Sequence, residues 1–192
     1  MDKNRKRRVC LLTLSLAILT FITSNLAAGT TPTLGQLPRV GDKAPAFILT
    51  NTDLQDVSLA DFSGYNLVLN IFPSVDTPVC AASLRRFNEH ANNLPGTKVL
   101  AISMDLPFAM KRHCAAIGLD DIIPLSAFRS PSFGEDYGVL IPATPMKGLL
   151  ARAVVVIDRE GKVLYNEFVF DINNEPDYDK AIAALPDMDE VD

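Results

Sequence analysis

Three runs of hydrophobic residues stand out along the chain and predict strands that are buried on both faces. They cover residues 67–72, 98–104 and 153–157 and consist mainly of Val, Ile, Leu, Ala and Phe. Such a run is typical of a strand in a sheet that helices cover on both sides, because neither set of alternate side chains meets water. Two shorter strands are predicted at residues 47–50 and 122–127.

Helical periodicity fills the segments between these strands. A long helix is predicted after Pro78, because apolar residues there recur at steps of four and three and so form one stripe. The members of this stripe are Cys80, Leu84, Phe87, Ala91 and Leu94, and the Pro95-Gly96 pair ends it. A second helix is predicted at residues 107–117, where Gly118 is a typical stop.

The remaining segments predict short elements, which complete an α/β domain. They are, in chain order, an extended lead-in at 29–46, a polar turn at 51–56, helical segments at 58–62 and 132–137, a hairpin of 153–157 with 163–170, and a closing helix at 176–185. Strand, helix, strand, helix, hairpin and last helix is the order of a thioredoxin-like fold. That fold has a mixed central sheet with helices on both faces.

The first 28 residues differ from the rest of the chain. A basic cluster precedes an apolar run at residues 9–22, and small residues follow the run. The cluster is Lys3, Arg5, Lys6, Arg7 and Arg8, and the small residues are Ala27, Ala28 and Gly29. This three-part pattern is typical of a secretory signal. The alternative is an uncleaved anchor, which places the protein at a membrane, but the run is shorter than the ~20 residues that a spanning helix needs.

We therefore expect residues 1–28 to be a signal peptide and residues 29–192 to be an exported, periplasmic domain. The alternative localisation is a membrane-anchored protein that faces the periplasm. The leader holds five basic residues and one acidic residue, which leaves 13 basic and 22 acidic residues in the domain, a net charge of −9. This acidic balance argues against nucleic acid as a partner, because phosphate binding depends on Lys and Arg.

The domain retains two cysteines, Cys80 and Cys114, because Cys10 lies in the leader. Thr77 or Asp76 is a suitable N-cap and Pro78 suits the first helical position, so Cys80 falls in the first turn of its helix. The free N–H groups and the positive end of the helix dipole favour a thiolate there. The alternative is that Cys80 is a buried small hydrophobe of the apolar stripe.

The spacing Pro73-x-x-x-Thr77-x-x-Cys80 decides between these two interpretations, because it resembles the P-x-x-x-T-x-x-C signature of peroxiredoxins. The longer string NIFPSVDTPVCAAS at residues 70–83 is similar to the thiol peroxidase branch of that family. Further similar segments lie at 103–109, 125–129, 147–158 and 175–178, so the resemblance covers about residues 40–186. It implies an atypical two-Cys peroxidase of the thioredoxin-like superfamily, which reduces hydrogen peroxide and organic hydroperoxides.

The resemblance implies a role for each of five residues. Cys80 corresponds to the peroxidatic cysteine, which becomes a sulfenic acid, and Cys114 to the resolving cysteine, which forms an intrachain disulfide with it after local unwinding of the Cys80 helix turn. Thr77 corresponds to the residue that hydrogen-bonds the peroxide, and Pro73 to the one that shields the sulfenic acid from water. Arg152 corresponds to the arginine that holds the thiolate and the peroxide. Taken alone, an arginine at the start of a strand is typical of a surface charge.

The family also implies partners. We expect a thioredoxin-like dithiol reductant, a homodimer and hydroperoxide substrates, and apolar residues such as Phe108, Leu140 and Ile141 permit organic ones. We expect no cofactor and no metal, because His90 and His113 have no metal-like set of neighbours. The export signal is unusual for the family and leaves the reductant open. In addition, residues 29–46 are too short and Pro-rich for the N-terminal hairpin with which thiol peroxidases usually begin.

Two other functions remain as alternatives. The first is an exported binding domain in which Cys80–Cys114 is a permanent structural disulfide. The second is a general thiol oxidant that uses no peroxide, and the presence of Thr77 and Arg152 speaks against it, because disulfide exchange needs no partner for an oxyanion.

Overall fold

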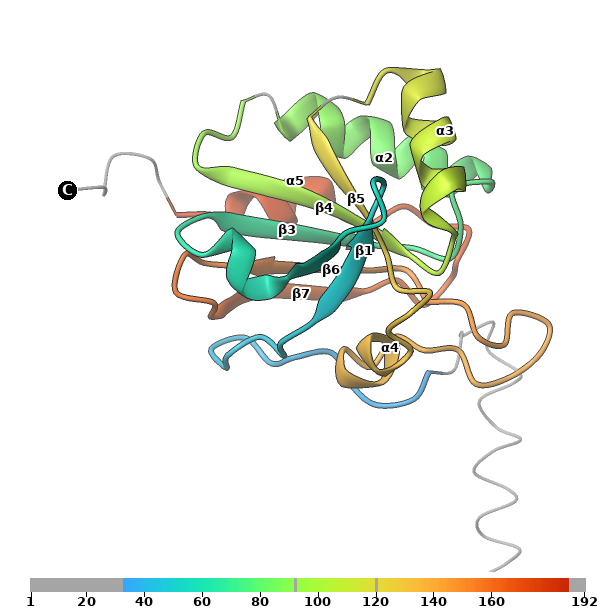
Figure 1. The fold of residues 1–192 in the computed structure, drawn as a ribbon. Coiled ribbons are helices and arrows are strands. Elements are labelled where there is room, and N and C mark those ends of the chain that lie inside the picture. Colours follow the sequence, from blue (N-terminus) through green and yellow to red (C-terminus); the bar gives the residue numbers. More distant parts are fainter. Residues whose placement is uncertain (1–32, 92, 120, 187–192) are drawn as a thin grey trace, which may run out of the picture.

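The structure, a computed structural model, describes residues 33–91, 93–119 and 121–186 and contains a seven-stranded mixed sheet (Figure 1). The strand order is β2-β1-β5-β4-β3-β6-β7. In chain order the elements are β1 (Ile48–Asn51), β2 (Asp56–Ser58), η2 (Leu59–Phe62), β3 (Asn66–Ile71), α2 (Pro78–Ala91), β4 (Thr97–Ser103), α3 (Pro107–Ile117), β5 (Ile122–Ser126), α4 (Ser132–Asp136), β6 (Ala153–Ile157), β7 (Val163–Phe168) and α5 (Tyr178–Ala183).

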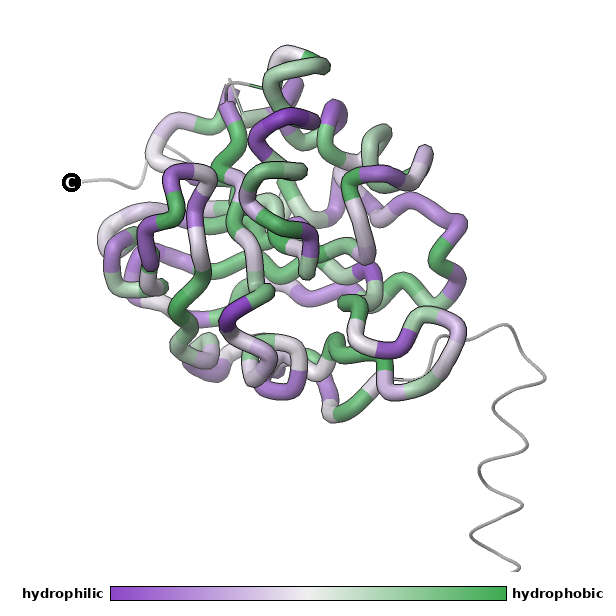
Figure 2. Tube along the Cα trace, turned by 45° about the vertical axis from the view of Figure 1, so that its right-hand side comes forward, coloured by the Kyte–Doolittle hydropathy of each residue, from purple (hydrophilic) through white to green (hydrophobic). Residues whose placement is uncertain are grey.

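The hydrophobic runs of the sequence form the centre of this sheet. β3 is buried along its whole length, and it pairs in parallel with β4 and antiparallel with β6. β6 is also buried throughout. Figure 2 shows hydrophobic residues through the middle of the molecule and hydrophilic ones mainly in its outer turns and helices. The three predicted buried strands are therefore confirmed.

Helices cover both faces of the sheet, as the predicted thioredoxin-like α/β fold requires. On one face, α2, α3 and α5 pack on a cluster that includes Val68, Phe72, Val154 and Val156. On the other face, the residues of η2 and α4 pack on a second cluster. The odd and even residues of β3 fall into different clusters, because successive side chains of a strand point to opposite faces.

The second predicted helix begins and ends where the sequence indicates. Pro107 occupies the first turn of α3, where a missing N–H removes no helical hydrogen bond. Gly118 follows the helix with φ 65° and ψ 46°, a left-handed conformation that glycine adopts readily, and its N–H donates to the carbonyl of Cys114.

Several boundaries differ from the sequence prediction; β7, for example, ends at Phe168 instead of residue 170. Residues 51–56 do not form one polar turn, because Asp56 already pairs with Thr50 as the start of β2. The turn is tight because the Asn51 side chain accepts hydrogen bonds from the N–H groups of Asp53 and Gln55, each at 2.9 Å. The helix after Pro78 ends at Ala91 instead of Leu94, and α5 is shorter than the predicted 176–185.

The predicted leader lies outside the described residues, so the signal peptide and the anchor both stay predictions. Across residues 33–91, 93–119 and 121–186, no helix is long and apolar enough to cross a membrane. The described part of the lead-in runs along the domain and makes isolated bridges through Leu34 to Leu140 and through Lys43 to Lys162.

Candidate active site

Cys80 lies in the first turn of α2, just beyond the carboxyl end of β3, and is fully buried. Thr77 is the residue before the helix: its carbonyl accepts the N–H of Ala81 at 3.0 Å, and its hydroxyl accepts the N–H of Cys80 at 3.4 Å. Thr77 is therefore the N-cap, whereas Asp76 is exposed. The N-cap contact holds the Thr77 hydroxyl next to the backbone of Cys80.

Arg152 contacts the sulfur of Cys80 directly. Its Nη2 lies 3.3 Å from Cys80 Sγ and 3.2 Å from the carbonyl oxygen of Ile172, to which it also donates. The side chain is only 1% exposed. Arg152 precedes β6, and because Ala153 pairs with Ile71 in β3, the arginine stands beside the segment that leads to Cys80. The surface position that a lone arginine suggests is thus wrong for this residue.

The electrostatic setting of Arg152 favours an anion at Cys80. Among the described residues, the guanidinium makes no ion pair within 4.0 Å with a carboxylate, and its Nε and Nη1 are buried without a hydrogen-bond partner. A buried cation without a counter-charge is costly, so the guanidinium, 3.3 Å from Cys80 Sγ, suits a negatively charged partner. Two donor nitrogens, Nε and Nη1, then remain for a ligand that carries oxygen.

Pro73 and Cys114 complete the set of predicted site residues. Pro73 is buried in the segment between β3 and α2. Cys114 lies on α3, is 7% exposed and belongs to the same apolar cluster as Cys80. Burial raises the pKa of the Cys114 thiol. Both thiols are free, so at least one sulfur must move before a disulfide can form.

Comparison with known proteins assigns the chain to a family. A family model described as Redoxin matches residues 39–182. The thiol peroxidase of Corynebacterium glutamicum is 57% identical over 155 residues, which are 81% of this chain and 93% of that protein. The chain belongs to the thiol peroxidases of the Redoxin family. The thiol peroxidase of Mycobacterium tuberculosis is also 57% identical, over 153 residues, 80% of this chain and 92% of that protein.

Solved structures of similar proteins support the same family assignment and the same fold. A peroxiredoxin-like protein from Aquifex aeolicus matches with a TM-score of 0.75 and 39% identity, over 81% of this chain and 95% of that one. A thiol peroxidase from Chromobacterium violaceum matches with a TM-score of 0.75 and 29% identity, over 80% and 89% of the two chains. The predicted family, the thioredoxin-like fold and the assignment as a peroxidase enzyme are confirmed.

Two hydrogen-bonding features near Arg152 and Cys80 were not predicted from the sequence. The carbonyl of Ile172 orients Arg152, and a backbone carbonyl leaves no sequence signal. One turn after Cys80 on α2, buried Ser83 donates to Asn70 Oδ1 of β3 at 3.1 Å. An Asn within the hydrophobic run at 67–72 and a Ser on the buried side of the helix could have indicated this pair.

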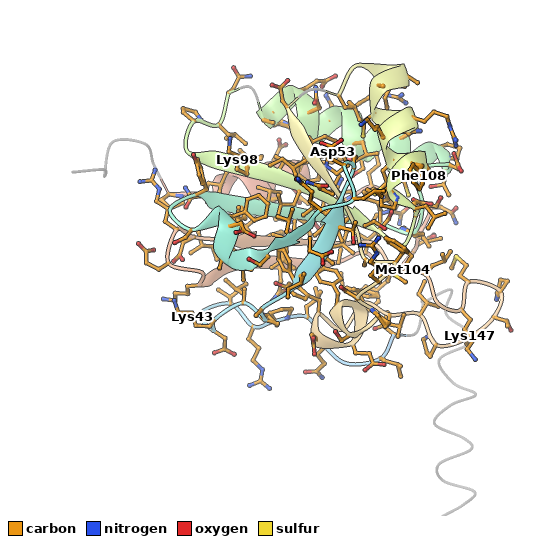
Figure 3. All side chains as sticks on the ribbon, in the orientation of Figure 1. Lys43, Asp53, Lys98, Met104, Phe108 and Lys147 are labelled. Atoms are coloured by element: carbon orange, nitrogen blue, oxygen red, sulfur yellow. The ribbon has the colours of Figure 1, made fainter. Side chains whose placement is uncertain are left out.

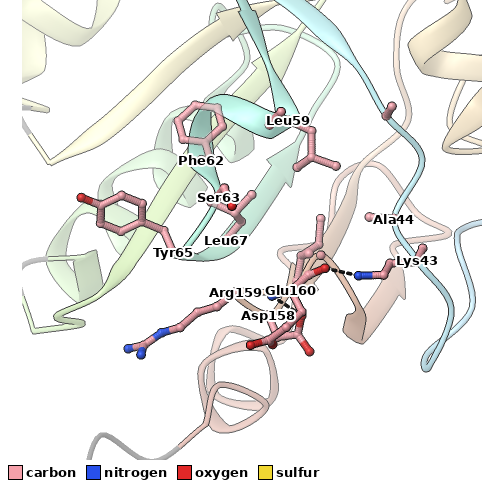
Figure 4. A pocket seen from close by; sticks show the side chains of 14 residues that line it. Lys43, Ala44, Leu59, Phe62, Ser63, Tyr65, Leu67, Asp158, Arg159 and Glu160 are labelled. Atoms are coloured by element: carbon pink, nitrogen blue, oxygen red, sulfur yellow. Dashed lines mark hydrogen bonds between the residues drawn. The ribbon is translucent and has the colours of Figure 1, made fainter. Parts of the chain in front are cut away.

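One cavity of the thiol peroxidase domain lies away from these residues. It measures about 270 Å³ and includes Leu59, Phe62 and Leu67 in its lining (Figure 4). Leu67 stands at the amino end of β3, whereas Cys80 follows its carboxyl end. Since no predicted site residue lines this cavity, we do not assign it to the peroxidase reaction. Within the described part of the chain, no group of three or more His, Cys, Asp or Glu residues could hold a metal ion.

Proposed function

We propose that the protein reduces hydrogen peroxide and organic hydroperoxides at Cys80, with Cys114 as the resolving cysteine. The observation that carries this proposal is the contact between Arg152 Nη2 and Cys80 Sγ at 3.3 Å in a fully buried site. A fixed guanidinium beside the sulfur favours the thiolate, which is the nucleophile. It also stabilises the negative charge that develops on the departing peroxide oxygen.

In the first step the Cys80 thiolate attacks one oxygen of the hydroperoxide. A sulfur–oxygen bond forms and the oxygen–oxygen bond breaks, which leaves Cys80 as a sulfenic acid and releases an alkoxide or hydroxide. This leaving group takes up the proton that the thiol gave up, so the products are the sulfenic acid and an alcohol or water. The free Nε and Nη1 of Arg152 are the donors for the two peroxide oxygens, and the Thr77 hydroxyl joins them once it turns away from the carbonyl of Ser74, to which it donates here.

In the second step the Cys114 thiol displaces water from the sulfenic acid and forms the Cys80–Cys114 disulfide. A reduced dithiol then restores both thiols by thiol–disulfide exchange and becomes a disulfide itself. We propose a thioredoxin-like protein as this donor. Buried Pro73, just upstream of the cysteine turn, excludes water from the sulfenic acid.

The compartment, the assembly and the range of substrates are parts of the same proposal. The leader pattern of residues 1–28 supports an exported protein, which would need a dithiol donor outside the cytoplasm. Family membership supports a homodimer. Phe108, 62% exposed at the start of α3 (Figure 3), provides an apolar surface for organic hydroperoxides. By contrast, Ile141 is 2% exposed and belongs to the protein interior.

A comparison of the protein with its Cys80→Ser and Cys114→Ser variants tests this function. With a reduced dithiol donor, the wild-type protein should consume peroxide, and mass spectrometry should find a Cys80–Cys114 disulfide after one equivalent. The Cys80→Ser variant should consume none. The Cys114→Ser variant should stop at the Cys80 sulfenic acid or proceed to sulfinic acid. Peroxide consumption by Cys80→Ser at the wild-type rate would rule the proposal out.

The alternative of a permanent structural disulfide gains no support from the thiol peroxidase relatives. The same experiment distinguishes it from the proposed function. A structural bridge would be present before peroxide is added and would resist mild reductant.

A further inference from the structure

The carboxylate of Asp105 accepts three hydrogen bonds from two separate segments of the chain. Its Oδ1 accepts the Ser74 hydroxyl at 2.9 Å, and its Oδ2 accepts the N–H of Val75 at 2.8 Å. Oδ2 also accepts the Ser103 hydroxyl at 2.8 Å. Hydrogen bonds to a charged acceptor are about twice as strong as those between neutral groups. We call Asp105, Ser74, Val75 and Ser103 the Asp105 clamp.

One side of the Asp105 clamp is fixed to the sheet. Ser103 is the last residue of β4, is fully buried, and also accepts the N–H of Asp105 at 3.1 Å. The hydroxyl of Ser126, at the end of β5, donates to the carbonyl of Asp105. The carboxylate therefore projects from a rigid corner between β4 and α3.

The other side of the clamp leads directly to the reactive cysteine. The carbonyl of Ser74 accepts the N–H of Thr77 at 3.3 Å and its hydroxyl at 3.4 Å. The Thr77 hydroxyl in turn accepts the N–H of Cys80 at 3.4 Å. The chain of contacts thus runs from Asp105 through Ser74 and Thr77 to Cys80, and Asp105 itself stands two residues before α3, the helix of Cys114.

Cys80 needs two different positions in the proposed reaction. Its sulfur must lie against Arg152 to attack peroxide, and it must leave Arg152 to bond with Cys114, because the two thiols are separate in this structure. In the first of these arrangements, which this structure shows, Asp105 holds residues 74 and 75, the segment that leads to Cys80.

We propose that Asp105 is a positioning residue that favours the arrangement with Cys80 against Arg152 over the arrangement in which Cys80 meets Cys114. This inference rests on the proposed peroxidase function. Loss of the clamp slows the attack on peroxide. It also speeds disulfide formation relative to over-oxidation, because the sulfenic acid spends less time in the peroxide-reactive arrangement.

The test uses Asp105→Ala, with Asp53→Ala as the matched control. Asp53 lies on the turn between β1 and β2 (Figure 3), and its carboxylate pairs with Lys111 of α3 at 2.9 Å on the surface. The Asp53→Ala variant therefore loses a carboxylate contact to α3, while the hydrogen bonds of residues 74 and 75 to Asp105 remain. Asp105→Asn keeps one accepting oxygen and should give an intermediate result. If Asp105→Ala does not fold, Ser74→Ala removes one bond of the clamp at a half-buried position.

Three quantities are measured in the full-length protein. The first is the rate of Cys80 oxidation in a Cys114→Ser background, which should fall about tenfold, the effect of one lost charge-assisted hydrogen bond. The second is the ratio of disulfide to sulfinic acid at high peroxide, which should rise about tenfold. The third is the hydrogen-exchange rate of the Val75 amide, which should increase. A role in stability alone would lower the melting temperature without a change in the first two.

The outcomes separate this inference from the proposed function. If the wild-type protein does not react with peroxide, the proposed function fails, and the Val75 exchange still reports on the clamp. If the wild type reacts but Asp105→Ala matches Asp53→Ala in rate and product ratio, the positioning role is overturned, whatever the exchange shows.

Discussion

Replacing Arg152 with Met separates the contribution of this side chain to the reaction from its contribution to stability. Met fills a similar volume but has no charge and no N–H donor. The lost contact is 3.3 Å long, and at an effective dielectric constant of about 20 two unit charges at that distance interact by about 5 kcal/mol. The loss of a buried charge-assisted donor in mutagenesis is smaller, about 3 kcal/mol. We therefore expect Cys80 oxidation to slow by a factor of about 10² to 10³.

Removal of a fully buried side chain usually destabilises a protein, but we expect Arg152→Met to leave the free energy of unfolding unchanged or to increase it. Arg152 has no carboxylate partner among the described residues, and its Nε and Nη1 lack hydrogen bonds. A buried charge without a carboxylate partner costs free energy, and its replacement by an apolar side chain of similar size removes that cost. The free energy of unfolding of Arg152→Met should therefore stay within about 1 kcal/mol of the wild-type value or exceed it.

Stopped-flow measurement of Cys80 oxidation and denaturant unfolding of the reduced protein check the two expectations. Arg159→Met is a suitable control, because Arg159 follows the opposite end of β6 and lines the cavity of Figure 4. An Arg152→Met protein that reacts at the wild-type rate would refute the role of the guanidinium. A decrease of more than about 3 kcal/mol in the free energy of unfolding would show that the fold depends on the Arg152 side chain, and would refute the second expectation.

Three further predictions concern the surroundings of Cys80. Because burial raises the pKa of Cys114, the folded thiol keeps its proton to a higher pH than the unfolded thiol does. Disulfide formation should therefore speed up, and the stability of the reduced protein should fall, as the pH rises above about 8.5; pH-independent kinetics would contradict this. Thr77→Ala should lose about 1 kcal/mol of stability with its N-cap and also slow Cys80 oxidation, whereas Thr77→Ser should retain both in the same two assays. Ser83→Ala should cost about 1–3 kcal/mol in denaturant unfolding, because it leaves Asn70 Oδ1 unsatisfied, and an unchanged midpoint would argue against that bond.

Much of the fold could be predicted because burial alone determines the pattern of its central elements. The runs at 67–72, 98–104 and 153–157 become β3, β4 and β6, which helices cover on both faces. β2 was missed because none of its three residues is fully buried. Its backbone conformation follows from its partner β1 and from the Asn51 turn, which hydrophobic periodicity does not report.

The site was predictable only where its chemistry is local. The position of Cys80 in the first turn of α2 follows from Thr77 and Pro78, which lie within three residues of it. The burial of Arg152 could not be derived from pattern, because its partner Cys80 is 72 residues away in the chain. Only the resemblance to a family indicated this arginine.

The lengths of the hydrogen bonds around Cys80 localise the movement that the reaction needs. The two bonds between Thr77 and Ser74 and the bond from Cys80 to Thr77 are 3.3–3.4 Å long, near the limit for such contacts. The bonds from Ser74 and Val75 to Asp105 are 2.8–2.9 Å long and reach a carboxylate. Opening should therefore begin at the weak contacts of residues 76–80, and the stronger bonds from residues 74–75 to Asp105 oppose it. Such a division lets Cys80 leave Arg152 for Cys114 and return, while β3 and the rest of α2 stay folded.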